Sequence, residues 1–427
     1  MLDPRLIREN PDLVKQAVKN KSEKCDIDAI LELDRQRREL IGEKESLEAK
    51  KNKASRDIAV AKKEGKDASG AIAEMREVAE NINKLADTLK EVEFQLESAL
   101  LTVPNIPHAD VPVGSDESGN IIVRQVGEKR QFDFKIREHT EIGEIVAALD
   151  IPRGVKVSGS GFYTLTGPGA LLERALINFM LDLHTTEHGY RELIIPYIAG
   201  PAAMIGSAQL PKLADDMYHI ESDDLYLIPT AEVPITNLHA GEILQAEDLP
   251  KYYCAFSPCF RREAGSYGKD VRGITRVHQF HKVEMVKIVE PESSYEEHEK
   301  LLANAEAILQ KLELPYRVNL LCTGDLSFAA AKCYDLEAFA PGMDSWLEVS
   351  SCSNFEAFQA RRMNLRYRPE KGAKPVFVHT LNGSGLALPR TVIAILENYQ
   401  QADGSVTVPK VLVPYMRGLE RLEPISQ

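Results

Sequence analysis

The chain has 427 residues, a net charge of −13 and 44% hydrophobic residues. A chain of this length is expected to form two or three domains, and its acidic balance excludes a surface that is basic throughout, so any nucleic acid would have to bind a local basic region. The six cysteines form no Cys-x-x-Cys pair, and neither a signal peptide nor an apolar run long enough to span a membrane is present, which predicts a cytoplasmic protein with reduced thiols and no zinc ribbon.

Residues 28–101 predict two long helices that pair with each other. The stretch contains no proline, and apolar residues recur every seven positions, as in a coiled coil. A segment with Gly65 and Gly70 predicts a turn, so the helices, each of about 30 residues and about 45 Å, are expected to run antiparallel and extend into solvent. The repeating residues are Leu33, Leu40, Leu47, Ala54 and Ala61 before the turn, and Met75, Val78, Ile82, Leu85, Leu89, Val92, Leu96 and Ala99 after it.

The end of this helical hairpin is basic although the chain is acidic. Residues 50–66 contain seven Lys and Arg against two acids, a net charge of +5. Solvated faces of coiled coils carry such charges, and so do surfaces that bind RNA phosphates, so charge alone leaves both interpretations open. The candidate RNA contacts are Lys50, Lys51, Lys53, Arg56, Lys62 and Lys63.

Prolines then mark the end of the helical region. Pro104, Pro107 and Pro112 predict a stiff linker, so we divide the chain into a helical domain of residues 1–104 and a second domain of residues 105–427. Residues 168–188 predict a helix with its apolar face on Leu172, Leu176, Phe179 and Leu183. The proline in the following apolar run, YRELIIPYI, predicts an edge strand or an interface.

Residues 251–263 and 273–288 predict the two strands of an antiparallel hairpin, joined by the glycine-containing loop 264–272. Because side chains alternate along a strand, Arg261 and Glu263 are expected on one face and Arg262 on the other. The residues expected on one face of the second strand are His278, Phe280, Lys282 and Glu284. An aromatic ring between an arginine and carboxylates suits a nucleobase or a flat cationic ligand better than a structural ion pair.

Two more polar clusters interrupt apolar strands nearer the C-terminus. In WLEVSSCSNFE, Glu348 and Ser350 alternate, and the residues from Ser353 to Glu356 have the form of a capping box that starts a helix. In HTLNGSGLALPR, a strand is expected to end at about Asn382 and to place Arg390 in the first turn of the next helix. An arginine there opposes the helix dipole, which favours a bound phosphate over an ion pair with a neighbouring acid. Neither of the common glycine-rich nucleotide motifs, GxxxxGK[ST] and GxGxxG, is present.

The segments CFRREAGSYGKDVRGITRVHQF and GSGLALPRTVIAILENYQ resemble the second and third motifs of class II aminoacyl-tRNA synthetases. The helix of residues 168–188 and the proline-containing strand after it resemble the first motif. With the flanking PTAEVP and EVSSCSNFEAFQARR, the chain resembles the bacterial seryl-tRNA synthetase family over essentially its whole length. The third motif reads LPR here, where some members have a glycine before the arginine.

The resemblance implies an α+β fold in which helices flank a central antiparallel sheet, with an N-terminal coiled-coil arm and a homodimeric assembly. It implies that ATP, Mg²⁺ and serine react to give seryl-adenylate and pyrophosphate, after which serine passes to tRNA(Ser). A second acceptor, tRNA(Sec), stays open. The basic arm is implied to hold the long variable arm of the tRNA.

Carried over residue by residue, the resemblance assigns the α-phosphate to Arg261 and the adenine to Glu263 and Phe280. It assigns Arg276 and Arg390 to the β- and γ-phosphates. The whole implied ATP set is Arg261, Arg262, Glu263, Arg276, Val277, Phe280, Glu348, Val349, Ser350, Ser351 and Arg390, with Arg261, Glu263 and Arg390 as catalytic residues and Glu348 and Ser351 as Mg²⁺ ligands. The implied serine set is Thr230, Ala231, Glu232, Arg261, Glu284, Asn382 and Ser384.

Three other interpretations compete with this one. A relative that loads an amino acid onto a carrier protein would lack the long arm, which is present here. A non-catalytic paralogue would have lost residues such as Arg261, Glu263 or Arg390, and all are retained. A coiled-coil scaffold would leave the polar clusters of the C-terminal strands without a role.

Overall fold

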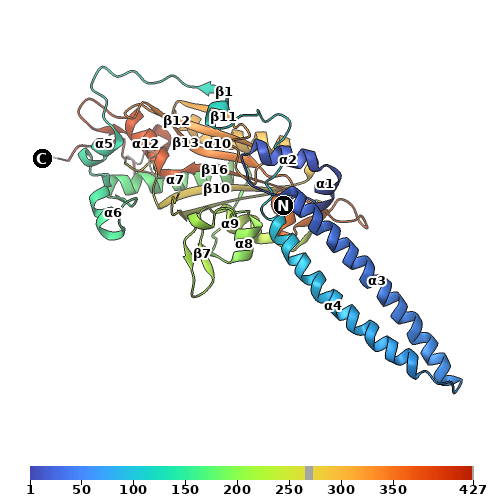
Figure 1. Ribbon diagram of the computed structural model, residues 1–427. Helices are drawn as coiled ribbons and strands as arrows, with labels where there is room; N and C mark the ends of the chain where they lie inside the picture. Colours follow the sequence, from blue (N-terminus) through green and yellow to red (C-terminus); the bar gives the residue numbers. More distant parts are fainter. Residues whose placement is uncertain (265–272, 426–427) are drawn as a thin grey trace. The chain divides into compact units, whose positions relative to one another are not determined.

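The computed structural model (Figure 1) describes residues 1–264 and 273–425, so most of the predicted loop 264–272 lies outside the described residues. Internal contacts divide the chain into two units, one of Met1–Lys19 with Glu23–Pro104, and one of Asn20–Ser22 with the residues from Asn105 onward. The helices are α1 Pro4–Glu9, α2 Pro11–Asn20, α3 Ile27–Lys63, α4 Ser69–Leu100, α5 His139–Ile145, α6 Ile151–Ser158, α7 Gly167–Thr186, α8 Pro201–Gly206, α9 Glu232–Thr236, α10 Ser294–Lys311, α11 Phe358–Met363 and α12 Leu388–Asn398. Within the described ranges, no helix has the length and apolar character to cross a membrane.

In the first unit, α3 and α4 lie side by side and antiparallel (Figure 1), which confirms the predicted helical hairpin. Every residue of the predicted seven-residue repeats is partly or fully buried, whereas the six candidate RNA contacts are exposed. An ion pair of 3.0 Å between Arg37 and Glu93 crosses from one helix to the other. Arg37, a charged residue on α3, therefore has a partner on α4. The short helices α1 and α2 were not predicted.

The second unit contains an eight-stranded sheet in the order β1-β11-β12-β13-β16-β10-β9-β4. All neighbouring strands are antiparallel except β4 and β9, which confirms the predicted α+β class. These strands are β1 Ile121–Val126, β4 Arg191–Glu192, β9 Lys251–Phe260, β10 Gln279–Val289, β11 Tyr316–Leu320, β12 Lys332–Ala340, β13 Ser345–Asn354 and β16 His379–Ala387. The predicted proline-containing edge strand is reduced to β4, which ends before Pro196.

Ten shorter strands complete the unit within residues 105–264 and 273–425. They are β2 Leu149–Asp150, β3 Thr164–Leu165, β5 Ile198–Ala199, β6 His219–Ile220, β7 Leu225–Leu227, β8 Ile243–Gln245, β14 Arg366–Arg368, β15 Val376–Phe377, β17 Val406–Thr407 and β18 Arg421–Leu422. They form one three-stranded sheet from β15, β14 and β8, another from β5, β7 and β6, and two two-stranded pairs, β2 with β3 and β17 with β18.

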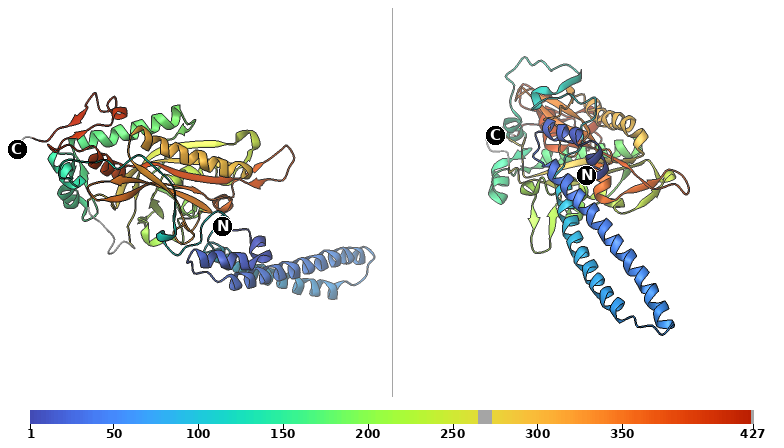
Figure 2. Two further views of the ribbon diagram at one scale, coloured as in Figure 1. Left: turned by 90° about the horizontal axis from the view of Figure 1, so that it is seen from above. Right: turned by 45° about the vertical axis from the view of Figure 1, so that its right-hand side comes forward.

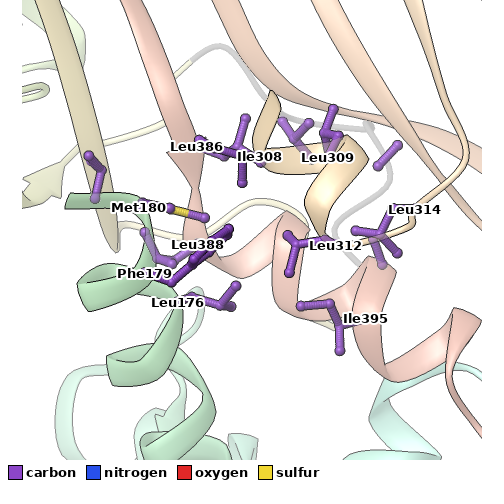
Figure 3. Packing of buried hydrophobic residues seen from close by; sticks show 14 of the residues in the cluster. Leu176, Phe179, Met180, Ile308, Leu309, Leu312, Leu314, Leu386, Leu388 and Ile395 are labelled. Carbon is purple, nitrogen blue, oxygen red and sulfur yellow. The ribbon is translucent and has the colours of Figure 1, made fainter. Parts of the chain in front are cut away.

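Helices α7, α10 and α12 supply the main core of this unit, and Figure 2 shows α7 and α10 on one face of the sheet. Figure 3 shows how Leu176, Phe179 and Met180 of α7 approach Leu388 and Ile395 of α12 and the leucines at the end of α10. The helix predicted at residues 168–188 is α7, and its predicted apolar face is buried. These helices therefore cover one face of the eight-stranded sheet and leave the candidate site to the opposite face.

The opposite face of the sheet changes character along β10. Val286 and Ile288 pack in a second core with residues of α8, α9 and α11. Because alternate residues share a face, Glu284, Lys282 and Phe280 continue the same row beyond that core. The row therefore passes from apolar to charged to aromatic, and the candidate site lies along its polar part.

Several local predictions are wrong. The strand expected to end at about Asn382 is β16, which continues to Ala387. The strand β9 ends at Phe260 and β10 begins at Gln279, so Arg261–Glu263 lie beyond a strand end and strand alternation does not determine where their side chains point. Glu263 has a φ of 51°, which turns the chain out of the extended conformation. The predicted capping box is also absent, because Ser353 stays in β13 opposite Asn382 and α11 begins only at Phe358.

Candidate active site

Three buried polar side chains meet at the polar end of the second core. Thr230 donates a hydrogen bond of 2.9 Å from its hydroxyl to Glu284 Oε2, and its hydroxyl accepts one of 3.2 Å from the backbone N–H of Glu232. Lys282 forms an ion pair with the same carboxylate of Glu284. Thr230 precedes α9 and Glu284 lies on β10, so the hydrogen bond between them connects the start of this short helix to a central strand of the sheet.

Glu232, the other buried carboxylate of this pocket, is held by an amide. Gln359 Nε2 donates to Glu232 Oε1 at 2.6 Å, while Gln359 Oε1 accepts from the Thr380 hydroxyl at 2.7 Å. The second contact orients the amide, so that its nitrogen faces the carboxylate. Burial and then the negative charge of Glu284 raise the pKa of Glu232 to about 7. The pocket is thus poised to accept a positive charge.

Asn382 and Ser384 complete this pocket from β16. Ser384 lies directly opposite Glu284 in the antiparallel pairing of β16 with β10, and Asn382 lies opposite Val286. Opposite residues share a face, so both point to the face that holds Glu284. The structure therefore brings together Thr230, Glu232, Glu284, Asn382 and Ser384 of the predicted serine set. Ala231 is fully buried at the start of α9, and Arg261 lies with the second group of side chains described next.

A second group of side chains follows β10 toward its beginning. The guanidinium carbon of Arg261 lies 5.1 Å from the centre of the Phe280 ring, a cation–π contact, and Arg261 Nε donates to the carbonyl of Pro229 at 3.3 Å. Arg276 pairs with Glu263 at 3.1 Å. The aromatic ring predicted between an arginine and carboxylates is present, although its neighbours come from the segments beyond the strands.

Arg262 is not brought into this group. Its side chain is exposed, and its backbone N–H donates to the carbonyl of Asp216 at 2.9 Å. Val277 and Val349 are buried in apolar clusters. For these two valines, only backbone atoms are available to a nucleotide.

Arg390 lies in the first turn of α12, as predicted. Its guanidinium donates to the carbonyls of Thr275 at 3.3 Å and of Glu348 at 2.8 Å, and lies 3.3 Å from the Glu348 carboxylate. The ion pair with a neighbouring acid is thus present, and the acid is itself a predicted site residue. Arg390 therefore joins α12 to β13 and to the segment that carries Arg276.

The expected alternation of Glu348 with Ser350 is wrong because β13 contains a bulge. Glu337 pairs with Glu348, and the next residue of β12, Leu336, pairs with Ser350, so Val349 is an extra residue. Ser350 is consequently buried and donates to the carbonyl of Ser384 at 2.6 Å. Glu348 and Ser351 instead share the open face of the sheet.

Asp335 on β12 belongs with these two residues and was not predicted. It lies directly opposite Ser351, and burial, followed by the charge of Glu348, raises its pKa well above the usual range. The two neighbouring carboxylates, Asp335 and Glu348, repel each other when both are charged, and a bound cation would reduce that repulsion. Within the described ranges, no cluster of three or more His, Cys, Asp or Glu side chains could hold a metal by itself.

Sequence reasoning also missed Gln359 and the role of Lys282. Lys282 was visible as a neighbour of Glu284 on one strand face. Gln359 gave no comparable signal, because its contact with Glu232 joins residues 127 positions apart.

Comparisons with known proteins identify the family. Residues 1–107 match the seryl-tRNA synthetase N-terminal domain, and residues 217–399 match the tRNA synthetase class II core domain (G, H, P, S and T). The serine–tRNA ligase of Thermomicrobium roseum is 56% identical over 422 residues, which cover 99% of this chain and 95% of that protein. The serine–tRNA ligase of Carboxydothermus hydrogenoformans is 54% identical, with 99% of each chain covered.

A solved structure agrees with these relatives. The crystal structure of seryl-tRNA synthetase from Pyrococcus horikoshii complexed with ATP has a TM-score of 0.94 to this chain at 41% identity, with 100% of both chains covered. The agreement includes both the helical arm and the sheet, since the whole chain is covered. The chain therefore belongs to the seryl-tRNA synthetases, the class II aminoacyl-tRNA synthetases that act as serine–tRNA ligases.

Proposed function

We propose that serine binds in the pocket of Thr230, Glu232, Glu284, Asn382 and Ser384, and that ATP binds between Arg261, Phe280 and Arg390. The observation that supports this most is the row along β10. Phe280 and Glu284 share a face four residues apart, about 13 Å along the strand. That distance leaves room between the base and the amino-acid pocket for a ribose, the α-phosphate and the serine carboxylate.

In the proposed reaction, a serine carboxylate oxygen attacks the α-phosphorus, forming a phosphorus–oxygen bond as the bond to the β-phosphate breaks. Serine supplies the nucleophile, so the protein must orient the reactants and stabilise the charge that grows on the phosphate oxygens. Arg261 acts at the α-phosphate, and Arg276 and Arg390 neutralise the departing pyrophosphate. The adenylate then transfers serine to the 3′ end of the tRNA, and AMP leaves.

Mg²⁺ fits the side chains near Arg390. Glu348 and Ser351 share the open face of β13 and would hold it, with Asp335 beside them. Mg²⁺ commonly takes one or two carboxylates and completes its shell with substrate phosphates and water, which matches this small donor set. When bound, it would supply positive charge to the phosphate oxygens.

The proposed serine pocket explains selectivity by hydrogen bonding and size. A site built to bind a hydroxyl rejects alanine strongly, because its own buried polar groups would be left unpaired. Threonine must be rejected by its extra methyl group, which is weaker, about 1–3 kcal/mol. The side chains of Thr230 and Ser384, both buried, bound the available space.

Serine binding is expected to weaken as the pH falls below 7. The raised pKa of Glu232, about 7, means that the carboxylate becomes neutral below this pH and can no longer pair with the serine ammonium. The KM for serine in pyrophosphate exchange should therefore rise by up to about tenfold per pH unit below 7. Glu232→Gln should raise the KM at neutral pH and remove this dependence. A flat KM profile in the unmodified enzyme would contradict the assignment.

The exposed cations of the arm support a tRNA-binding role for residues 1–104, with catalysis in residues 105–427. Lys50, Lys51, Lys53, Arg56, Lys62 and Lys63 would meet the phosphates of the long variable arm of tRNA(Ser), and tRNA(Sec) is the further acceptor to test. We also propose that the enzyme acts in the cytoplasm as a homodimer. Ile194, Tyr197 and Ile198 follow the edge strand β4 and are all exposed, and such a group of exposed apolar side chains supports an interface there.

The proposed site is tested by ATP–pyrophosphate exchange with each of the twenty amino acids in the absence of tRNA. We expect exchange with serine and at most a low rate with threonine. Exchange that is equally fast with alanine would contradict the proposed pocket. Loss of all exchange, with tRNA binding retained, would mean that these side chains do not form a working site without tRNA.

A further inference from the structure

A buried carboxylate–histidine pair lies outside the side chains discussed above. His139 begins α5 and Glu397 lies in the last turn of α12, and both are fully buried. Glu397 Oε1 accepts from the backbone N–H of His139 and lies 2.9 Å from His139 Nδ1. Glu397 Oε2 accepts from the N–H groups of Gly342 and Met343 at 2.8 and 3.1 Å.

These contacts fix the tautomer of the imidazole. A carboxylate only accepts hydrogen bonds, so the Nδ1 of His139 must carry the proton that faces Glu397. Nε2 is then the acceptor of the ring, and it accepts the backbone N–H of Ile274 at 3.4 Å. Both ring nitrogens are used, and the histidine connects α12 to Ile274.

Ile274 belongs to a short segment, Gly273–Val277, whose residues contact the ATP residues one after another. Ile274 and Val277 are buried in a cluster that includes Ile393 of α12 and Phe280 at its edge. The carbonyl of Thr275 accepts from Arg390, and Arg276 pairs with Glu263. A displacement of this segment would therefore move both arginines that are proposed to bind the β- and γ-phosphates.

The position of Gly273 shows how closely the imidazole approaches this segment. Its φ is 63°, and a Cβ built on it would lie 1.9 Å from His139 Nε2. A side chain at this position would collide with the ring. Because Gly273 has no side chain, the imidazole of His139 can come close enough to accept the N–H of Ile274.

We infer that His139, oriented by Glu397, is a positioning residue that holds Gly273–Val277 where Arg276 and Arg390 can meet the ATP phosphates. The inference rests on the proposed ATP roles of these two arginines. The residue acts through the segment and touches no reactant. Its loss should weaken ATP binding while the serine pocket on the other side of Phe280 stays intact.

Two substitutions separate the two nitrogens of the ring. In His139→Asn, the amide nitrogen can replace Nδ1 toward Glu397, but the side chain is too short to reach Ile274. In His139→Gln, the amide oxygen can reach the position of Nε2 and accept the N–H of Ile274. We expect His139→Asn to raise the KM for ATP in pyrophosphate exchange by about 10- to 100-fold and His139→Gln by about threefold at most, with the KM for serine unchanged in both.

Equal ATP KM values in the two variants, whether raised or not, would overturn the inference. Gly273→Ala approaches the same contact from the other side and replaces His139→Asn if that variant does not fold. It should raise the KM for ATP in the same way, and an unchanged value would count against the inference.

Arg276→Ala, measured alongside, distinguishes the inference from the proposed function. If Arg276→Ala raises the KM for ATP and the two His139 variants behave alike, only the positioning role fails. If Arg276→Ala is silent, the ATP role of Arg276 fails, and a difference between the His139 variants still supports positioning through Arg390. Where both act, His139→Asn should raise the KM for ATP less in the Arg276→Ala background than in the intact enzyme, because only the part of its effect that acts through Arg390 remains.

Discussion

Arg390→Ala is expected to slow serine-dependent ATP–pyrophosphate exchange by about 10²- to 10³-fold in kcat/KM for ATP, the cost of removing one donor aimed at developing charge. The Arg390 side chain is 26% exposed, and its ion pair with Glu348 lies at the proposed metal position. The substitution therefore removes a cation from the phosphate region and leaves Glu348 without this partner. Exchange kinetics at saturating serine measure the effect.

Arg390→Lys separates charge from geometry, because a lysine keeps the charge but cannot reproduce the flat fork of donors. We expect it to recover only part of the activity. Arg368 offers a matched control, since its guanidinium also donates to a backbone carbonyl, that of Ala373 at 2.9 Å, away from the proposed site. A normal exchange rate in Arg390→Ala would contradict the assignment of Arg390 to the phosphates. An equal loss of exchange in Arg368→Ala would contradict it too.

Deletion of residues 35–95 should abolish aminoacylation of tRNA(Ser) and leave serine-dependent pyrophosphate exchange within about twofold of the intact enzyme. The cut suits the structure, because the ion pair of Arg37 with Glu93 shows which residues of α3 and α4 lie opposite each other. Joining Asp34 to Leu96 with a short glycine linker closes the hairpin three residues below that pair on each helix. Loss of both activities would show that the arm is needed for folding or for catalysis itself.

A charge variant tests the same role without shortening the chain. Replacing Lys50, Lys51, Lys53, Arg56, Lys62 and Lys63 by Ala should raise the KM for tRNA and flatten its dependence on salt, by about 0.7–0.9 logarithmic units of slope for each phosphate that the arm no longer neutralises. Lys84 and Lys90 are exposed on the same arm, on α4 away from the turn. Their replacement is the control and should change neither quantity much.

The helical arm was predictable because its signal is local. The seven-residue repeat depends on neighbours one or two turns away, and each repeating residue proved to be partly or fully buried. The position of Arg390 in the first turn of α12 was predictable for the same reason. Motif resemblance then supplied the family, which the comparisons confirm.

The strand ends and the bulge were not predictable from one segment at a time. Whether β9 stops at Phe260, or whether Val349 is left unpaired, depends on the partner strand. Strand alternation therefore predicted that Glu348 shares a face with Ser350, whereas the bulge places it on the same face as Ser351. Long-range polar contacts are harder still, since Gln359 reaches Glu232 across 127 positions and Glu397 reaches His139 across 258.

The helical hairpin has one more consequence, which concerns its length. The first turns of α3 also contact the preceding helices, through the ion pairs of Arg8 with Asp34 and Lys15 with Asp28. Beyond them α3 packs against α4, so the arm can change by whole heptads in both helices without altering the contacts that remain. One heptad changes the length by about 10.5 Å. The length of the arm can thus change in steps of one heptad, and in the proposed binding mode these steps would determine how far along the tRNA the basic end of the arm reaches.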